Sequence, residues 1–295
     1  MDVKNHNMNK EKPIMRKRFR IIAFLAFFFG IIMAVSQYFE FVSKTVYEES
    51  VSHLTEVFHQ SDNMLGELTH KNLMYLHMWS EYLQDAPSES KIRDYIDKAQ
   101  KDAGFLYFYF LSADGNYKMT TGETGYLGLQ ENIEDEIQKG NDIITNAAVP
   151  GKSQMLVFAS PKAHGSYQGF KYDAIAIAYE NADIVNVLDI SAFNGKAKSY
   201  VLHPDGRVVI DHSLESWGNV YNFFGILREH TDISEKEILE ISKKFKEGHT
   251  GAMLLNLDGK DYYLVYEKSD IQDWVFLGLV QADIVNASMN TLHLS

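Results

Sequence analysis

The sequence predicts an α+β fold in which an N-terminal transmembrane helix leads into a long stalk helix and two successive modules, each with an antiparallel sheet. Three observations predict this architecture. A basic cluster at residues 16–20 is followed by an uncharged apolar run at residues 21–35. Residues 37–85 contain no proline and a single glycine, which is typical of one long helix. From residue 104 onward, a pattern of hairpin, helix and further strands occurs twice.

Residues 16–42 form the predicted transmembrane anchor. A span needs about 20 apolar residues, and the aromatic residues Phe19, Tyr38 and Phe41 extend the apolar run at its two ends. Basic residues are retained on the cytoplasmic side of a membrane. We therefore expect residues 1–15 to be a disordered cytoplasmic tail and the main domain to be extracytoplasmic.

The rival interpretation of this segment is a cleaved signal peptide. Ala34-Val35-Ser36 has the small-x-small pattern of a cleavage site. The helical pattern continues from Gln37 without a break, which favours an uncleaved anchor in the cell membrane. Under either interpretation, most of the protein works outside the cytoplasm.

Charge and cysteine content exclude several classes of protein. The chain has a net charge of −12, and its first 20 residues carry seven basic and two acidic side chains, so the remainder carries −17. A body this acidic is a poor partner for nucleic acid. The sequence has no cysteine, which excludes disulfides, thiolate catalysis and cysteine metal sites. An exported domain without disulfides fits a bacterial cell surface.

Residues 43–86 form the predicted stalk helix, which should end before Pro87. Its apolar stripe, at helical spacings, consists of Leu54, Phe58, Leu65, Leu68, Leu76, Trp79 and Leu83. Ser61 and Asn72 occupy positions in this stripe that would be apolar in an ideal coiled coil. The stripe packs against the protein's own sheets or against a second copy, and a stalk could do both at different heights. A homodimer through the stalk helix is the expected assembly.

A membrane-distal module is predicted at residues 87–190. Ser88 can cap its first helix, and Gly104 can end that helix. A hairpin with an Asp-Gly turn follows at residues 105–121. The other elements predicted here are a helix near residues 133–139 and strands at residues 154–160 and 171–179.

A membrane-proximal module is predicted at residues 191–281, and residues 282–295 should form an exit helix toward a second membrane span. This module begins with another Asp-Gly hairpin at residues 199–210. Its other predicted elements are a helix at residues 234–247 and strands at residues 252–257, 260–267 and 274–280.

A short internal repeat supports two copies of one unit. Ala182-Asp-Ile-Val-Asn186 recurs 100 residues later as Ala282-Asp-Ile-Val-Asn286. The apolar strand before the first copy, residues 175–178, aligns with residues 275–278 before the second. A pentapeptide that recurs after matching strands, in matching order, indicates a repeated structural unit.

The order of these elements resembles the double Cache sensor domain, a pair of PAS-like modules on the outside of bacterial transmembrane receptors. The resemblance covers residues 37–290, with local matches at residues 107–121, 154–161, 197–211 and 262–280. It implies a small-molecule ligand in the distal module and a signal passed down the stalk. It also implies a second membrane span and a cytoplasmic output domain beyond residue 295, so we expect this chain to be part of a longer receptor.

The resemblance implies a histidine kinase as the first expectation for the output domain and a diguanylate cyclase as the second. It leaves the ligand open. The sequence lacks the Arg-x-Trp-Tyr signature of the amino-acid-binding members, so that ligand class is not carried over.

A ligand pocket in the distal module should be lined by one face of its sheet and the loops over it, with aromatic walls and few polar groups. The candidate ligand-binding residues are Tyr107, Tyr109, Tyr126, Phe158, Ser160, Tyr172 and Glu180. Near Glu180, the resemblance implies an acidic residue that pairs with a ligand amine. The alternatives are that the aromatic residues belong to the core and that Glu180 is a solvated strand end. Arg207 and Asp211 of the second module are weaker candidates.

The sequence contains no motif of the familiar catalytic, metal or cofactor sites that we sought. Asp211-His212-Ser213 has the residue types of a catalytic triad, but neighbours on a strand point to opposite faces. We therefore expect no catalytic residue, no metal site and no cofactor in this chain. Two other functions stay open: a membrane-anchored solute-binding protein without signalling output, and an exported hydrolase.

Overall fold

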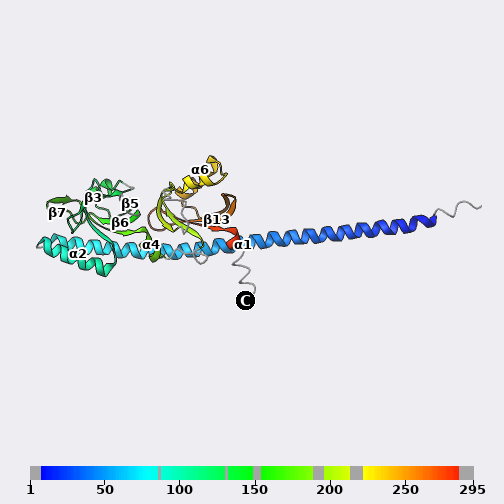
Figure 1. Cartoon of the computed structure of the whole chain (residues 1–295), viewed down its shortest axis with the longest axis horizontal. Coiled ribbons are helices and arrows are strands. Elements are labelled where there is room, and N and C mark those ends of the chain that lie inside the picture. The colour runs from blue at the N-terminus through cyan, green and yellow to red at the C-terminus, as the bar shows by residue number, and fades with distance from the viewer. Residues whose placement is uncertain are drawn as a thin grey trace, which may run out of the picture. The chain divides into compact units, whose positions relative to one another are not determined.

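The computed structural model describes residues 8–85, 88–129, 132–148, 154–188, 196–212 and 222–285, with the backbone alone for residues 8–23, 39, 40, 42, 43, 46, 50, 103, 148, 187 and 212. The chain falls into two compact units, Met1–Ser50 and Val51–Ser295. One helix, α1 (Met8–Gln84), belongs to both units (Figure 1). It is unbroken through the predicted stalk and ends before Pro87, as the sequence predicts.

The first unit is the helical segment that carries the predicted anchor. Helix α1 begins at Met8, inside the tail predicted to be disordered, because a helix adds residues easily once it has formed. Large apolar side chains are exposed in succession, at Phe24, Leu25, Phe27, Phe28, Phe29, Ile31, Ile32, Met33 and Val35. Among the residues whose side chains are described, no helix is apolar over a length sufficient to cross a bilayer. The side chains of residues 16–23 of the predicted anchor lie outside that set.

The part of the second unit that corresponds to the predicted membrane-distal module is called the distal half here, and the part that follows it the proximal half (Figure 1). The distal half is built on a seven-stranded antiparallel sheet with the order β3-β2-β1-β9-β6-β5-β4. Its strands are β1 (Tyr107–Leu111), β2 (Asn116–Lys118), β3 (Thr124–Tyr126), β4 (Gly128–Leu129), β5 (Ile143–Ala148), β6 (Gln154–Ser160) and β9 (Ala174–Glu180). A separate hairpin pairs β7 (Gly165–Tyr167) with β8 (Phe170–Tyr172).

Three helices accompany this sheet: α2 (Glu89–Ala103), α3 (Glu134–Lys139) and α4 (Asn181–Leu188). Helix α2 ends at Gly104 as predicted, with a φ of 76° that glycine adopts without strain. Ser88 occupies the predicted N-cap position, but its side chain makes no capping hydrogen bond. Its hydroxyl instead lies 3.2 Å from that of Ser90.

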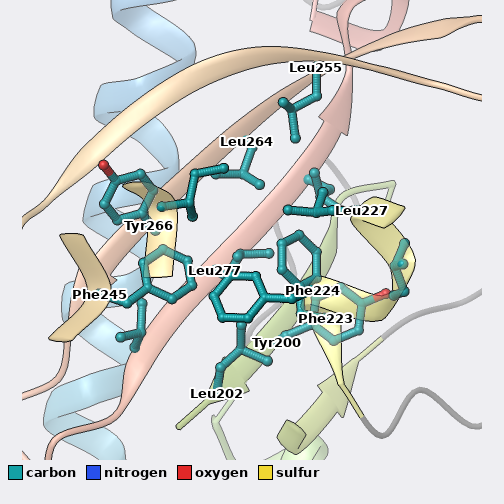
Figure 2. Packing of buried hydrophobic residues seen from close by; sticks show 14 of the residues in the cluster. Tyr200, Leu202, Phe223, Phe224, Leu227, Phe245, Leu255, Leu264, Tyr266 and Leu277 are labelled. Atoms are coloured by element: carbon teal, nitrogen blue, oxygen red, sulfur yellow. The ribbon is translucent and has the colours of Figure 1, made fainter. Parts of the chain in front are cut away.

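The proximal half is built on a five-stranded antiparallel sheet with the order β11-β10-β14-β13-β12. Its strands are β10 (Lys198–Leu202), β11 (Val208–His212), β12 (Gly251–Leu257), β13 (Lys260–Lys268) and β14 (Val275–Gln281). Helices α5 (Phe223–His230) and α6 (Glu235–Lys246) cover one face, and aromatic rings such as Phe223, Phe224 and Phe245 fill the space beneath them (Figure 2). A capping box between Ser234 and Glu237 begins α6.

The two sheets repeat one strand order. In each, the last strand lies beside the first strand of a hairpin, and two further strands follow on its other side: β2-β1-β9-β6-β5 in one sheet and β11-β10-β14-β13-β12 in the other. The seven-stranded sheet adds β3 and β4 at its two edges. Strand β9 thus corresponds to β14, which is the alignment that the pentapeptide repeat predicts. The repeated unit is confirmed at the level of strand order, while the module boundaries at residues 87, 190 and 281 stay a prediction.

The apolar stripe of α1 packs against the protein's own sheets. The Phe58 ring stacks on Phe276 of β14 at 5.9 Å, and the Trp79 ring lies 5.8 Å from Phe108 of β1. Both polar residues of the stripe are buried and hydrogen-bonded: the Ser61 hydroxyl donates to the Leu188 carbonyl, and the Asn72 amide oxygen accepts from the Tyr179 hydroxyl at 2.8 Å. The first of the two alternatives for the stripe is therefore the one observed.

Some elements differ from the prediction. The strand predicted at residues 171–179 is divided at Asp173, whose carboxylate accepts the Ala113 N–H and whose own N–H donates to the Leu111 carbonyl. These long-range bonds turn the chain between β8 and β9. Strands β3, β4, β5 and β7 and helices α4 and α5 lie in segments for which the sequence predicts no strand or helix.

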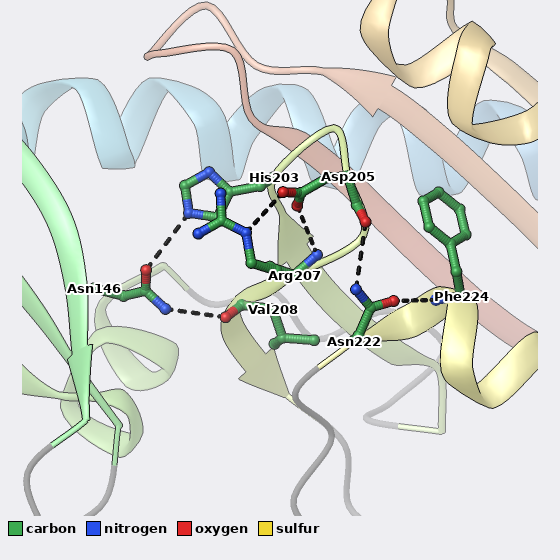
Figure 3. A network of polar contacts seen from close by, with 7 residues as sticks. All are labelled: Asn146, His203, Asp205, Arg207, Val208, Asn222 and Phe224. Atoms are coloured by element: carbon green, nitrogen blue, oxygen red, sulfur yellow. Dashed lines mark hydrogen bonds and ion pairs between the residues drawn. The ribbon is translucent and has the colours of Figure 1, made fainter. Parts of the chain in front are cut away.

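Two asparagine side chains connect the distal and proximal halves. The Asn146 amide of β5 donates to the Val208 carbonyl of β11 at 3.1 Å (Figure 3). Asn181, the first residue of α4, donates to the Asp211 carbonyl at 2.7 Å and accepts from the Asp211 N–H at 3.0 Å. Strand β11 of the proximal sheet is therefore hydrogen-bonded to two elements of the distal half.

Candidate functional site

The seven-stranded sheet has two faces with different contents. Tyr109, Val157 and Ala176 point to the face that packs beneath Ile133 and Ile137 of the α3 segment, and we call it the α3 face. Residues at alternate positions point to the opposite side, where Phe108 contacts Trp79 of α1. We call that side the α1 face.

The centre of the α3 face is lined by small side chains: Ala147, Ala159, Ala176 and Ala178. Tyr109 lies among them and is buried, and among the described residues its hydroxyl donates to the Met155 sulfur alone, at 4.0 Å. Burial raises the pKa of the Tyr109 hydroxyl, and the nearby Tyr117, Tyr107 and Glu123 raise it further. The hydroxyl therefore stays neutral and has only a weak acceptor beside it.

An open groove of about 1000 Å³ lies at the Asp-Gly turn between β1 and β2. We call it the turn groove. Its lining residues come from the turn, from β3, from the start of α3 and from the chain around β8: Ser112, Ala113, Asp114, Asn116, Tyr117, Thr124, Gly125, Tyr126, Glu134, Gly169, Phe170, Lys171 and Asp173. Tyr117 belongs both to this lining and to the core beneath α3. The groove is thus continuous with the α3 face.

The turn groove is acidic. Asp114, Glu134 and Asp173 contribute three carboxylates, and Lys171 contributes a single cation. The hydroxyl of Ser112 and the backbone and side-chain amides of Asn116 donate to Asp114. These hydrogen bonds, that from Ser112 foremost, hold the pKa of the Asp114 carboxyl below its usual range. Asp114 is therefore ionised at neutral pH, and the groove favours positively charged groups.

Aromatic side chains form one wall of the turn groove. Tyr126 is 59% exposed there, and Tyr117 is buried behind it. Gly125 precedes Tyr126 in β3 and pairs across the strands with Tyr117 of β2, and a Cβ on it would lie 2.7 Å from the Tyr117 hydroxyl oxygen. A glycine is required here because the Tyr117 ring passes directly over the backbone of β3.

The seven predicted ligand-binding residues are divided among three places. Tyr107 and Tyr109 stack at 5.9 Å on the α3 face, and strand register places Glu180 on the same face, opposite Met155. Tyr126 alone lines the turn groove. Asp173, which lines the turn groove, comes just before β9, and Glu180 is the last residue of that strand, roughly 20 Å away. Glu180 and Tyr126 therefore do not contact one small ligand.

The remaining predicted residues lie on the α1 face. Phe158 packs edge-on against Tyr179, and Tyr172 packs against Phe110 at 4.9 Å. The Ser160 hydroxyl donates to Asp142 at 2.7 Å, and the second oxygen of that carboxylate lies 2.6 Å from Nε2 of His77 in α1. Ser160 is thus linked to α1 through Asp142, and the structure does not group these three residues with Tyr107 and Tyr109.

The structure adds Asp114, Glu134 and Asp173 to the candidate residues. They are far apart in the sequence: antiparallel pairing of β1 with β9 brings Asp114 and Asp173 to the same end of these strands, and Glu134 joins them from the start of α3. The Asp-Gly turn was visible in the sequence and was assigned only a structural role. Its position in the groove depends on contacts between residues 112–114 and Asp173 that no local pattern reveals.

The weaker candidates of the proximal half have structural partners. The Arg207 guanidinium donates to Asp205 at 2.7 Å, and the Asp211 backbone is paired with Asn181. Ser213 lies outside the described residues, as does the side chain of His212. Within the described parts of the chain, no three histidine or acidic side chains gather as a metal site would require.

Several solved structures share this fold. The extracellular domain of mmHK1S-Z3, described as a histidine kinase, aligns with a TM-score of 0.58 at 13% identity, covering 84% of this chain and 99% of that domain. The ligand-binding domain of the Pseudomonas aeruginosa amino acid chemoreceptor PctB, solved with L-Arg, aligns with a TM-score of 0.56 at 15% identity, covering 80% and 97%. That of the Campylobacter jejuni chemoreceptor Tlp3, solved with L-norvaline, aligns with a TM-score of 0.51 at 11% identity, covering 82% and 94%.

These alignments define the class of fold. The chain has the fold of the extracellular sensory domains of histidine kinases and chemoreceptors, which confirms at the level of fold the Cache resemblance seen in the sequence. No protein-family model matches the sequence, and no curated protein matches it significantly.

Proposed function

We propose that this chain is the extracytoplasmic sensing region of a bacterial transmembrane receptor, which binds a small molecule in its distal half. The observation that carries this proposal is the combination of two like-ordered sheets packed along one continuous helix. Extracellular domains of the same fold, from receptors of two kinds, support it. The output domain would lie beyond this chain, with a histidine kinase as the first candidate and a diguanylate cyclase as the second.

The N-terminal segment anchors the receptor under this proposal, with residues 16–42 in the bilayer and the N-terminus in the cytoplasm. Consecutive exposed apolar side chains from Phe24 to Val35 support a lipid environment, because large apolar patches are costly in water. The basic residues at positions 16–20 support the orientation. A homodimer belongs to the same proposal, and it would use faces of α1 other than the stripe covered by the sheets.

The turn groove is the ligand site that the geometry supports best. Three carboxylates and one lysine favour a ligand with a protonated amine, and the exposed ring of Tyr126 offers a surface for its apolar part. L-Arg in the domain of PctB is a ligand of this kind, although that domain is only 15% identical to this chain. Tyr107, Tyr109 and Glu180 on the α3 face form the second proposed position for a ligand.

Binding would act by shifting the population between two arrangements of the domain. A ligand changes that equilibrium only through its different affinity for the two arrangements. Asp173 can couple ligand binding to the sheet, because it lines the turn groove and its carboxylate also accepts the Ala113 N–H. Strand β9, which follows Asp173, leads directly to α4 and its bonds with β11.

Thermal unfolding of the full chain in lipid nanodiscs tests this site. L-arginine, putrescine and succinate serve as probes, and a probe at 100 times its dissociation constant should stabilise the domain by about 2.7 kcal/mol. We expect stabilisation by the two amines and none by succinate. Glu134→Gln and Tyr126→Ala should each weaken the effect, while Asp135→Asn, an exposed neighbour outside the groove, should not.

The same series separates the two proposed positions. Stabilisation that disappears in Glu180→Ala and persists in Glu134→Gln would place the ligand on the α3 face. No stabilisation of the unsubstituted chain by either amine would remove the amine ligand from the proposal.

A further inference from the structure

A second hollow lies between helices α1 and α2, away from the turn groove. We call it the aromatic hollow, and its lining residues are Tyr75, Met78, Trp79, Tyr95, Lys98, Ala99 and Asp102. Its volume is about 350 Å³, which falls within the range of small-molecule sites, roughly 300–1,000 Å³. It shares no lining residue with the turn groove.

The aromatic walls of this hollow are held in place by other rings. Tyr75 stacks on Trp79 with ring centroids 5.6 Å apart, and Trp79 is held in turn by Phe105 at 5.2 Å. Across the hollow, Tyr95 of α2 stacks on Tyr82 of α1 at 4.0 Å. A site whose walls are already fixed loses little conformational entropy when it binds a ligand.

Two opposite charges stand on α2 at the edge of the hollow. Lys98 and Asp102 are one helical turn apart, a spacing at which opposite charges commonly pair. Both side chains are exposed, and neither makes an ion pair or a hydrogen bond with another described residue. The Nζ of Lys71 also lies near one wall, 5.8 Å from the centroid of the Tyr75 ring. The hollow therefore offers one uncommitted cation and one uncommitted anion beside an aromatic surface.

We propose that the aromatic hollow binds a small zwitterion with an aromatic side chain, an aromatic α-amino acid in chemical terms. Lys98 takes the carboxylate, Asp102 takes the ammonium group, and the ligand ring packs against Tyr75 and Tyr95. Charge complementarity favours this occupant, because hydrogen bonds between ionised partners are the strong ones. A second copy of the chain would instead bury Lys98 and Asp102, at a desolvation cost, unless it supplied two matching charges.

A ligand in this position would contact α1 and α2 together. Residues 75–79 belong to the helix that also packs against the proximal sheet through Phe58, so occupancy would bear on α1 directly. The proposal does not depend on the turn groove being occupied, and it survives if the amine ligand proposed there fails.

Isothermal titration of the full chain in nanodiscs with L-tryptophan tests the proposal. We expect saturable binding, with affinity reduced about tenfold or more by Lys98→Gln and by Asp102→Asn. The matched controls are Lys101→Gln and Asp97→Asn, which change exposed residues of α2 outside the hollow and should retain the original affinity.

Two analogues assign the charges separately. Tryptamine lacks the carboxylate, so its affinity should be reduced by Asp102→Asn and unchanged by Lys98→Gln. Indole-3-propionate lacks the amine, so its affinity should be reduced by Lys98→Gln and unchanged by Asp102→Asn. Absence of L-tryptophan, L-tyrosine and L-phenylalanine binding would overturn the proposal, as would equal losses in the control variants. Sedimentation velocity adds a third overturning result: a dimer that Met78→Lys dissociates would show that a second copy covers the hollow.

Discussion

At the scale of single residues, His203 shows how burial decides the chemistry of a titratable group. It follows β10 and is only 5% exposed, with its ring edge-on to Trp274 at 6.0 Å. Its Nε2 lies 3.5 Å from the Asn146 amide oxygen (Figure 3). Burial foremost, together with the nearby Arg207 and against the opposite effect of Asp205, lowers the pKa of His203 to about 4. The imidazole is therefore neutral in the folded protein at neutral pH.

This lowered pKa predicts a loss of stability in mild acid. Between a pH of about 6.5 and about 4, the unfolded chain binds a proton at His203 that the folded chain does not. The free energy of unfolding therefore decreases as the pH is lowered through this range. The contribution is complete above pH 6.5 and lost below pH 4, and at most it amounts to about 3 kcal/mol. Urea unfolding at pH 7 and pH 4 should show a smaller decline for His203→Gln than for the unsubstituted chain. Parallel declines would contradict this assignment.

A second single position, Gly278 of β14, determines how closely α1 approaches the proximal sheet. A Cβ at Gly278 would lie 2.6 Å from Cζ of Phe58 and 3.2 Å from a methyl carbon of Leu54. Both side chains are fully buried in the α1 stripe. Only glycine at this position allows the helix and the strand to pack at their observed separation.

Gly278→Ala should therefore destabilise the chain by about 1–3 kcal/mol, the usual cost of an added methyl group in a packed core. Gly225→Ala is the matched control, because a Cβ at Gly225 in α5 meets nothing within 4 Å. Alanine is favoured over glycine inside a helix, so the control should be neutral or slightly stabilising. Chemical denaturation measures both variants, and equal stability of the two would contradict the close contact between Phe58 and β14.

At the scale of elements, the features with a local pattern were predicted and those without one were not. The apolar stripe from Leu54 to Trp79 specified a helix and its buried face, and the strand at residues 154–160 was predicted to the residue. Strand β5 was missed because its sequence, Ile-Ile-Thr-Asn-Ala-Ala, has neither alternation nor aromatic residues. It is a strand because β6 and β4 pair with it on both sides. Tertiary pairing outweighed a weak local preference.

The faces of the strands were only partly predictable. Alternation correctly placed Tyr107 and Tyr109 together. It could not relate them to Phe158 and Ser160, because two strands share a face only through their register, and register was unknown. The observed pairing of Phe158 with Ile177, rather than with an alanine of the α3 face, sends Phe158 to the α1 face.

At the scale of the whole described chain, the distal and proximal halves are coupled through β11. Asn146 is fully buried, and its amide satisfies the Val208 carbonyl, while Asn181 pairs with both backbone groups of Asp211 (Figure 3 shows the first contact). A buried carbonyl that loses its donor costs about 1–3 kcal/mol. These asparagines therefore favour one arrangement of the two halves.

Asn146→Ala and Asn181→Ala should each weaken this coupling. We expect faster hydrogen exchange in β11 than in the unsubstituted chain, with β13 and β12 at the far edge of the sheet unchanged, because the two asparagines contact β11 and His203 beside β10, at the opposite edge. Exchange of intact protein followed by mass spectrometry of the peptides measures this. Uniform acceleration throughout both sheets would show global destabilisation instead of a local loss of coupling.

The sequence by itself determined the stalk helix, the two hairpins and the repeated unit, because each depends on the spacing of residues that are near one another along the chain. Only the tertiary structure decided which of the candidate residues meet. Asp114, Glu134 and Asp173 converge on one groove, and Phe158 and Ser160 turn toward α1, because antiparallel register and long-range hydrogen bonds set these positions. Such contacts join residues tens of positions apart, and local periodicity carries no information about them.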